Sequence, residues 1–309
     1  MIHQRQVDNG CNNITKQQLM SNRVVKVLDQ VKKRKQRIAK TSFEEKLCSQ
    51  FSPYTTAKGI PRLEEHLFNK NSSSAVFSLS SLRDRYCLLY TVNGILRGES
   101  LFKSELSDLC DLIHKDQSTG QEILIHVMRI AMGKTNGLRV LYGRCIRHKD
   151  VNQCAIGALG LYLLGRSMLT SEFQRIDFSQ NEQWFNIKLL VDSRGENNAT
   201  SISDQAYYSS MKQACDALQI PSKHFVHFGR SAGSVKAELD ELDGYHINDI
   251  GNWNVDTRRD VYSAKLPMKA MRVMGGHPEY KGSVYLPRAN LDPPLTLQNN
   301  IPFHRRSHV

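Results

Sequence analysis

Two short segments in the last third of the chain carry the side chains best suited to chemistry on a phosphodiester. The first is His227-Phe-Gly-Arg230, and the second is Gly251-Asn-Trp253, which Tyr262 follows nine positions later. One helical turn separates His227 from Arg230, so a helix would point both side chains the same way. A histidine can move a proton, an arginine can hold an anionic oxygen, and a tyrosine hydroxyl can attack phosphorus. The order and spacing indicate a site that holds a phosphodiester and attacks it.

Two more cations precede these segments. Arg97 lies in Gly94-Ile-Leu-Arg-Gly-Glu-Ser100, and Lys134 lies between two apolar runs. Taken alone, each residue has a structural alternative. Arg97 could pair with a nearby glutamate, Lys134 could be solvated, and Trp253 and Tyr262 could be packing residues of a core. We favour a shared phosphate site because the residues occur as an ordered set.

The sequence indicates no metal or nucleotide cofactor. The Gly-Lys-Thr stretch at 133–135 lacks the glycine that a phosphate-binding loop requires five positions earlier, where Met128 stands. Cys145, His148 and Cys154 lack a fourth ligand at a suitable spacing, so we interpret that grouping as coincidence.

The charge of the chain predicts a polyanionic partner. Its 309 residues include 42 Lys and Arg against 30 Asp and Glu, a net charge of +12. The alternative is a soluble protein that is merely basic. Seven scattered cysteines without a Cys-x-x-Cys pair, and no secretory signal, indicate reduced thiols. The absence of an apolar run of about eighteen residues indicates no membrane span, and we expect the cytosol or nucleus.

The first 75 residues predict a basic helical region. Apolar residues recur at helical spacing between 16 and 47, and a shorter helix is expected at 62–68. A cationic run on this region would contact the DNA backbone; its residues are Lys32, Lys33, Arg34, Lys35, Arg37 and Lys40. A solvated helix surface and a nuclear-import signal are the alternatives for this run.

The remainder reads as mainly helical with one β-hairpin. Two runs rich in Ile, Val and Leu, 123–132 and 138–146, flank a glycine-bounded turn that carries Lys134. We expect helices at 79–95, 155–168, 204–220, 231–242, 247–251, 256–264 and 268–274. Five prolines from Pro278 onward predict an extended tail, either docked on a neighbouring molecule or disordered.

With these residues in place, the chain resembles the tyrosine recombinases. The catalytic domain of that family contains an arginine after a helix-ending glycine, a lysine on a β-hairpin, His-x-x-Arg, a histidine or tryptophan, and a tyrosine nine residues later. The corresponding residues here are Arg97, Lys134, His227, Arg230, Trp253 and Tyr262. The chain is most similar to the fungal branch containing the Crypton recombinases and the DNA-binding domain of the budding-yeast centromere-binding kinetochore scaffold. The stretches that carry this likeness are 96–101, 133–137, 147–150, 154–159, 227–233, 251–254, 262–267 and 271–276.

The resemblance implies an integrase-like catalytic domain over 76–278, a short helical region at 1–75 that is possibly a truncated core-binding domain, and a Pro-rich tail at 279–309. It also implies roles for the site. Tyr262 would form a 3′-phosphotyrosine link, Arg97 and Arg230 would clamp the non-bridging oxygens, and Trp253 would donate to the phosphate. His227 would assist proton movement, and Lys134 would protonate the leaving 5′ oxygen.

Three functional hypotheses follow. The first is a nuclear protein that binds double-stranded DNA on a recombinase fold and is domesticated from a Crypton-type element. The second is an active recombinase that cleaves, rejoins and integrates DNA. The third is a protein-interaction scaffold with incidental positive charge. The resemblance also implies a possible homo-oligomer and no small-molecule cofactor.

Overall fold

The computed structural model describes residue 30 and residues 57–70, 79–116, 119–130, 140–170, 173, 176–192, 200–220, 222, 225–253, 266–280, 282–291 and 294. The chain divides into two compact units, Met1–Gln50 and Phe51–Val309. Lys134, Tyr262 and the cationic run of residues 32–40 lie outside the described residues. Apart from residue 30, the described residues belong to the second unit.

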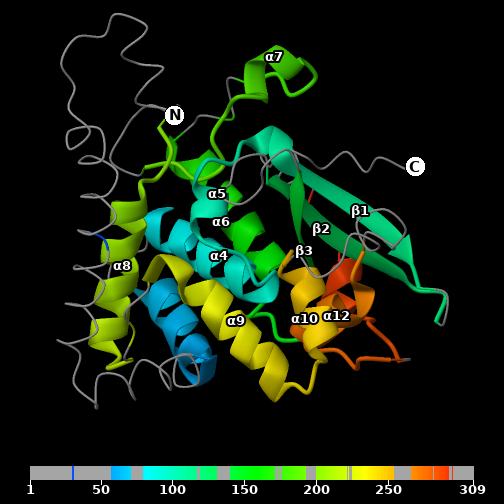
Figure 1. Cartoon of the computed structure of the whole chain (residues 1–309). Helices are drawn as coiled ribbons and strands as arrows, with labels where there is room; N and C mark the ends of the chain where they lie inside the picture. Colours follow the sequence, from blue (N-terminus) through cyan, green and yellow to red (C-terminus); the bar gives the residue numbers. More distant parts are fainter. Residues whose placement is uncertain are drawn as a thin grey trace, which may run out of the picture. The chain divides into compact units, whose positions relative to one another are not determined.

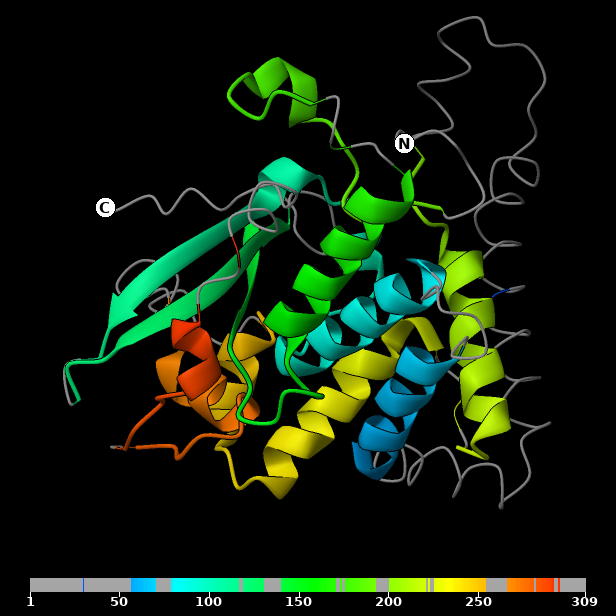
Figure 2. The same ribbon diagram turned by 180° about the vertical axis from the view of Figure 1, so that it is seen from behind.

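One buried helix organises this unit. Helix α4 (Leu79–Asn93) has thirteen buried residues out of fifteen. It contacts α6 (Ala155–Thr170), α8 (Asp204–Ala217) and α9 (Phe228–Leu239), which surround it in Figures 1 and 2. Its Leu82, Tyr86 and Leu89 belong to the same apolar core as residues of all three neighbours. The helices expected at 79–95, 155–168 and 204–220 are confirmed within a few residues.

Helix α9 approaches α4 more closely than side chains would allow. Gly229 and Gly233 lie one turn apart on the face of α9 that meets α4. A methyl group added at Gly229 would lie 1.9 Å from Thr91 Oγ1, and one at Gly233 would lie 2.4 Å from the Val92 carbonyl oxygen. Both distances are far below van der Waals contact, so this packing requires glycine at both positions.

A three-stranded antiparallel sheet packs beside the helices. It contains β1 (Leu109–Lys115), β2 (Glu122–Ile130) and β3 (Leu141–Ile146) in the order β1-β2-β3. Strands β2 and β3 are the two arms of the predicted hairpin, with Ile125 paired to Ile146 and Ile130 to Leu141. Strand β1 was not predicted. The fold class, mainly helical with a small antiparallel sheet, is confirmed.

Short helices connect these larger elements. They are α5 (Glu99–Phe102), η1 (Leu106–Asp108), α7 (Asn181–Trp184), η3 (Phe225–His227), α10 (Gly244–Ile250), α12 (Met268–Met274) and η4 (Pro287–Asn290). Helix α12 has the predicted bounds, and α10 begins three residues earlier than expected. The helix expected at 256–264 lies outside the described residues. Of the helices that the structure describes, none is long and apolar enough to cross a bilayer.

The helix at residues 57–69 packs into the core of the second unit. Its Leu63 and Leu67 are fully buried in that core. Glu64 accepts a 2.7 Å hydrogen bond from Arg85 Nε of α4, and both side chains are only 5% exposed. Burial raises the pKa of Glu64, and the bond to Arg85 opposes that effect. This segment is therefore a structural part of the unit, while the predicted boundaries at 75 and 278 stay predictions.

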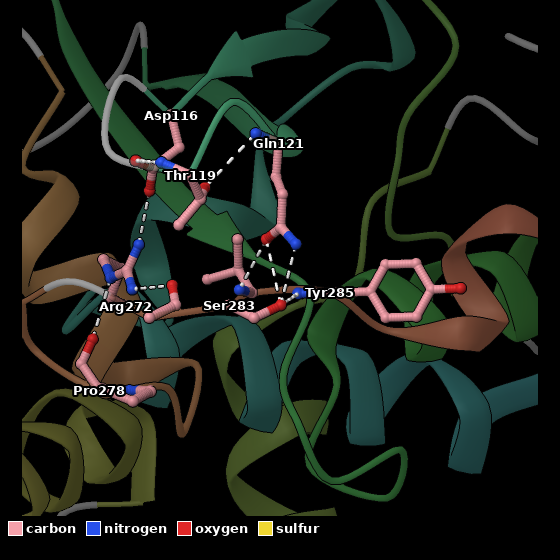
Figure 3. A network of polar contacts seen from close by, with 9 residues as sticks. Asp116, Thr119, Gln121, Arg272, Pro278, Ser283 and Tyr285 are labelled. Carbon is pink, nitrogen blue, oxygen red and sulfur yellow. Dashed lines mark hydrogen bonds and ion pairs between the residues drawn. The ribbon is translucent and has the colours of Figure 1, made fainter.

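The described part of the C-terminal tail lies against its own unit. Arg272 of α12 is buried; its Nη1 lies 2.6 Å from Asp116 Oδ2, and its Nε and Nη2 donate to the Pro278 and Gly282 carbonyls. The Val284 amide donates to Gln121 Oε1 at 3.0 Å (Figure 3). These bonds hold Pro278, Gly282 and Val284 close to Asp116 and Gln121.

The glycine contact between α4 and α9 predicts opposite effects for two glycine-to-alanine changes. Gly233→Ala would force the helices apart, and we expect a loss of about 1–3 kcal/mol in the free energy of unfolding. Gly160→Ala lies inside α6 with nothing within 4 Å of the added methyl. It should stabilise by about 0.5–1 kcal/mol, because alanine loses less backbone entropy. Urea unfolding of both variants measures the effects, and an unchanged midpoint for Gly233→Ala would contradict the close packing.

Candidate functional site

Arg97 lies on a tight turn that follows α4. The helix ends at Asn93, and the Leu96 amide then donates back to the Thr91 carbonyl at 2.9 Å. Ile95 takes the left-handed conformation, with φ of 51°, and is fully buried. That conformation is an outlier for a β-branched residue and costs on the order of 1–3 kcal/mol. The left-handed residue after α4 is therefore Ile95 and not the neighbouring Gly94, and packing holds Ile95 in the strained conformation.

Two glycines bring other segments against this turn. The Gly98 amide donates to the Val226 carbonyl at 3.1 Å, and a methyl at Gly98 would lie 2.8 Å from that oxygen. A methyl at Gly143 of β3 would lie 2.6 Å from Leu96 Cδ1. The turn carrying Arg97 thus touches the segment before His227 on one side and the base of the predicted hairpin on the other.

Arg230 links α9 to the segment after α10. Its Nη2 donates to the Gly251 carbonyl at 3.1 Å, and its Cζ lies 4.6 Å from the centre of the Trp253 ring. A guanidinium over an indole face is held by the ring quadrupole. The alternative interpretation placed Trp253 in the core. Trp253 is 36% exposed, so that interpretation is wrong. The Trp253 ring orients Arg230 and leaves the site open to solvent.

The two arginines are electrostatic neighbours. Burial first, and then the positive charge of Arg97, lower the pKa of Arg230 to about 10. Arg230 therefore stays protonated at neutral pH, where the two guanidinium groups repel each other. No carboxylate among the described residues forms an ion pair with Arg230, and Glu99 lies 4.0 Å from Arg97. A bound anion between the two arginines would relieve this repulsion.

His227 sits at the entrance of α9. It ends the 3-10 helix η3, serves as the N-cap residue of α9 and is exposed. The sequence predicted that one regular helix carries both His227 and Arg230. Arg230 does lie in α9, but His227 lies in the tighter 3-10 turn that precedes it. The twelve-residue helix α9 directs its N-terminal dipole to the same end that carries both residues.

Asn252 is a positioning residue that the sequence analysis missed. It takes the left-handed conformation, with φ of 52°, and its Nδ2 donates to the Tyr142 carbonyl of β3 at 2.9 Å. Asparagine tolerates this conformation better than most residues. The bond ties the segment carrying Trp253 to the start of β3. The only sequence signal was an asparagine between Gly251 and Trp253.

The structure therefore brings Arg97, His227, Arg230 and Trp253 to neighbouring segments. Gly98 and Val226 join the first two, and the bond from Arg230 to Gly251 joins the last two. The roles of Lys134 and Tyr262 stay predictions, because both residues lie outside the described part of the chain. The described groups can bind an anion with two guanidinium donors, an imidazole and a helix N-terminus.

Comparison with known proteins gives a family. The model of the family described as "Centromere DNA-binding protein complex CBF3 subunit, domain 2" matches residues 16–302. No curated protein matches the chain. Among solved structures, it is similar to an FLP recombinase–Holliday junction complex at 14% identity and a TM-score of 0.43, over 83% of this chain and 56% of that one. A Flpe–Holliday junction complex matches at 13% identity and a TM-score of 0.40, over 66% and 47%. The chain spans about half the length of these solved chains.

The paired arginines predict that a divalent oxyanion stabilises the protein. Sulfate should raise the melting temperature of the wild type more than that of Arg230→Gln at equal ionic strength. If Arg230→Gln weakens the site tenfold, the stabilisation by saturating sulfate falls by about 1.4 kcal/mol. The melting temperature in sulfate then rises about 2–4 °C less than that of the wild type. The control is Lys212→Gln, which removes one charge from an exposed pair on α8. Equal sulfate responses in all three proteins would contradict an anion site at Arg230.

Proposed function

The chain belongs to the family of the centromere DNA-binding CBF3 subunit, domain 2, and we propose that it binds double-stranded DNA on a tyrosine recombinase fold. Arg97 and Arg230 hold one backbone phosphate of the duplex. The observation that carries the proposal is that the turn carrying Arg97 meets the segment that enters α9, where Arg230 is held by the Gly251 carbonyl and the Trp253 ring. Burial first, and then the positive charge of Arg97, lower the pKa of Arg230 to about 10. Two guanidinium groups that repel each other are a costly arrangement unless an anion binds there.

A phosphodiester fits the chemistry of this site. Its two non-bridging oxygens can each accept a charge-assisted hydrogen bond from one guanidinium, which is the strongest class of hydrogen bond in proteins. The N-terminus of α9 adds the partial positive charge of its backbone N–H groups to that of the two guanidinium groups. His227 and Trp253 are both exposed, so a ligand outside the protein surface can reach them. A small internal anion would not require this open geometry.

The basic N-terminal segment also belongs to the proposal. The cationic run at Lys32–Lys35, with Arg37 and Lys40, contacts further phosphates and adds affinity without reading sequence. A protein that binds chromosomal DNA works in the nucleus. Descent from a Crypton-type element accounts for a set of recombinase residues in a family described by centromere binding.

A working recombinase is the second candidate. All six residue types occur in order: Arg97, Lys134, His227, Arg230, Trp253 and Tyr262. In this reaction the Tyr262 hydroxyl gives its proton to His227, and its oxygen attacks phosphorus and forms the 3′-phosphotyrosine bond. The bond from phosphorus to the 5′ oxygen breaks, and that oxygen takes a proton from Lys134. The arginines stabilise the charge that grows on the non-bridging oxygens.

DNA binding should weaken when either arginine is removed. We expect Arg97→Ala and Arg230→Ala each to raise the dissociation constant for a duplex by roughly 10- to 100-fold, the range of a charged hydrogen bond. Each variant should also flatten the plot of log affinity against log salt by about one unit. Fluorescence anisotropy with a labelled random-sequence duplex measures both quantities. Lys212→Gln serves as the control, and the absence of duplex affinity at low salt would favour the scaffold hypothesis.

A nicked suicide duplex separates binding from chemistry. An active recombinase should become covalently attached to the DNA in denaturing electrophoresis, because the nick releases the strand needed for rejoining. Tyr262→Phe should abolish the adduct and leave duplex affinity within about threefold, since the hydroxyl is only one of many contacts. If the wild type binds the duplex and forms no adduct, the protein is a binder alone.

A further inference from the structure

The chain between α6 and α8 forms an arm rich in aromatic residues. We call residues 176–187, which include α7, the aromatic arm. Figures 1 and 2 both show α7 standing apart from the other coloured helices and strands. The arm carries Asp177 and Glu182 and no lysine or arginine, whereas the whole chain has a net charge of +12. Its charge makes the arm unsuited to contact with a nucleic-acid backbone.

A fully buried arginine fixes the base of the arm. Arg166 of α6 donates from Nη1 to the Lys188 carbonyl at 2.8 Å, and its Cζ lies 5.2 Å from the centre of the Phe173 ring. Phe173 precedes the arm and Lys188 follows it, so one side chain holds both ends. Within the arm, the Phe185 carbonyl accepts a 2.8 Å hydrogen bond from Ser107 Oγ. The arm is therefore preorganised, which reduces the entropy lost when a partner binds.

Four aromatic rings connect this base to the solvent. Phe173 contacts Phe178, with 5.9 Å between the ring centres. Trp184 lies 6.2 Å from Phe178 and 4.7 Å from Phe185. Phe173 is only 6% exposed, whereas Phe185 at the other end is 41% exposed. Aromatic residues that are exposed and held rigid are typical anchors of protein interfaces.

A carboxylate accompanies the exposed ring. Glu182 of α7 and Phe185 are three positions apart, and Phe185 continues the helical conformation with φ of −57° and ψ of −38°. Side chains at this spacing are neighbours on one helix face, and both of these residues are exposed. Asp177, which is also exposed, supplies a second carboxylate before α7. A ring face attracts a cation through its quadrupole and a carboxylate attracts it through its charge, so the pair is complementary to a lysine or an arginine.

We propose that the aromatic arm binds a basic segment of another protein, with a lysine or arginine of that segment held by Phe185 and Glu182. An apolar helix does not match the arm, because the exposed residues of α7 are the polar Asn181, Glu182 and Gln183. The net charge of +12 opposes the approach of a second copy of this chain. The arm is small, so the binding is weak and depends on salt. The inference does not depend on DNA binding.

A basic model peptide tests this inference in the full-length protein without DNA. The probe is a fluorescein-labelled peptide of alternating arginine and glycine, and fluorescence anisotropy at about 0.15 M salt gives its dissociation constant. We expect saturable binding to the wild type. Glu182→Lys should raise the dissociation constant about tenfold, because an attraction becomes a repulsion. Phe185→Leu should raise it about 2- to 5-fold, because leucine keeps an apolar side chain and lacks the ring quadrupole.

Glu238→Lys is the matched control for the change of charge. Glu238 is an exposed glutamate of α9 outside the arm, and its variant should bind the peptide within about twofold of the wild type, because salt screens a distant charge. Glu182→Lys should keep the circular-dichroism melt of the wild type, since Glu182 is exposed.

Four results would overturn the proposal. They are no saturable binding to the wild type, equal weakening by Glu182→Lys and Glu238→Lys, full affinity in Phe185→Leu, and equal affinity for a peptide with glutamine in place of arginine. Self-association of the wild type that Glu182→Lys abolishes in sedimentation velocity would assign the arm to a second copy and would also overturn it.

Discussion

The approach of α9 to α4 is the constraint on which the site depends. Gly229 and Gly233 remove the side chains that would separate the two helices, and Thr91 and Val92 of α4 occupy that space. Because Arg230 lies between the two glycines on α9, this packing also sets its distance from the turn that follows α4. A single added methyl group on the shared face would move one guanidinium relative to the other. The glycines of this interface therefore set the position of Arg230 as well as the packing of the two helices.

The site holds two unfavourable features in place at once. Ile95 is kept in a strained conformation directly before Leu96 and Arg97, and Arg230 is kept charged while partly buried beside Arg97. Neither would persist in a flexible loop. Ile95 is fully buried in the core, and Arg230 is fixed by the Gly251 carbonyl and the Trp253 ring. The surrounding structure supplies the stability that these features cost, which is common at binding and catalytic sites.

Periodicity predicted the elements whose burial follows a regular pattern. The positions of α4 and α12 and the pairing of β2 with β3 followed from apolar spacing together with the glycines that end α4 and bound the hairpin turn. Strand β1 was missed because Asp111, His114 and Lys115 interrupt its apolar residues, so that the sequence shows no continuous strand pattern there. The left-handed turn at Ile95 was assigned to Gly94, because composition favours glycine there, whereas tertiary packing selects the isoleucine. The link from Asn252 to Tyr142 joins residues 110 positions apart, and no local pattern encodes it.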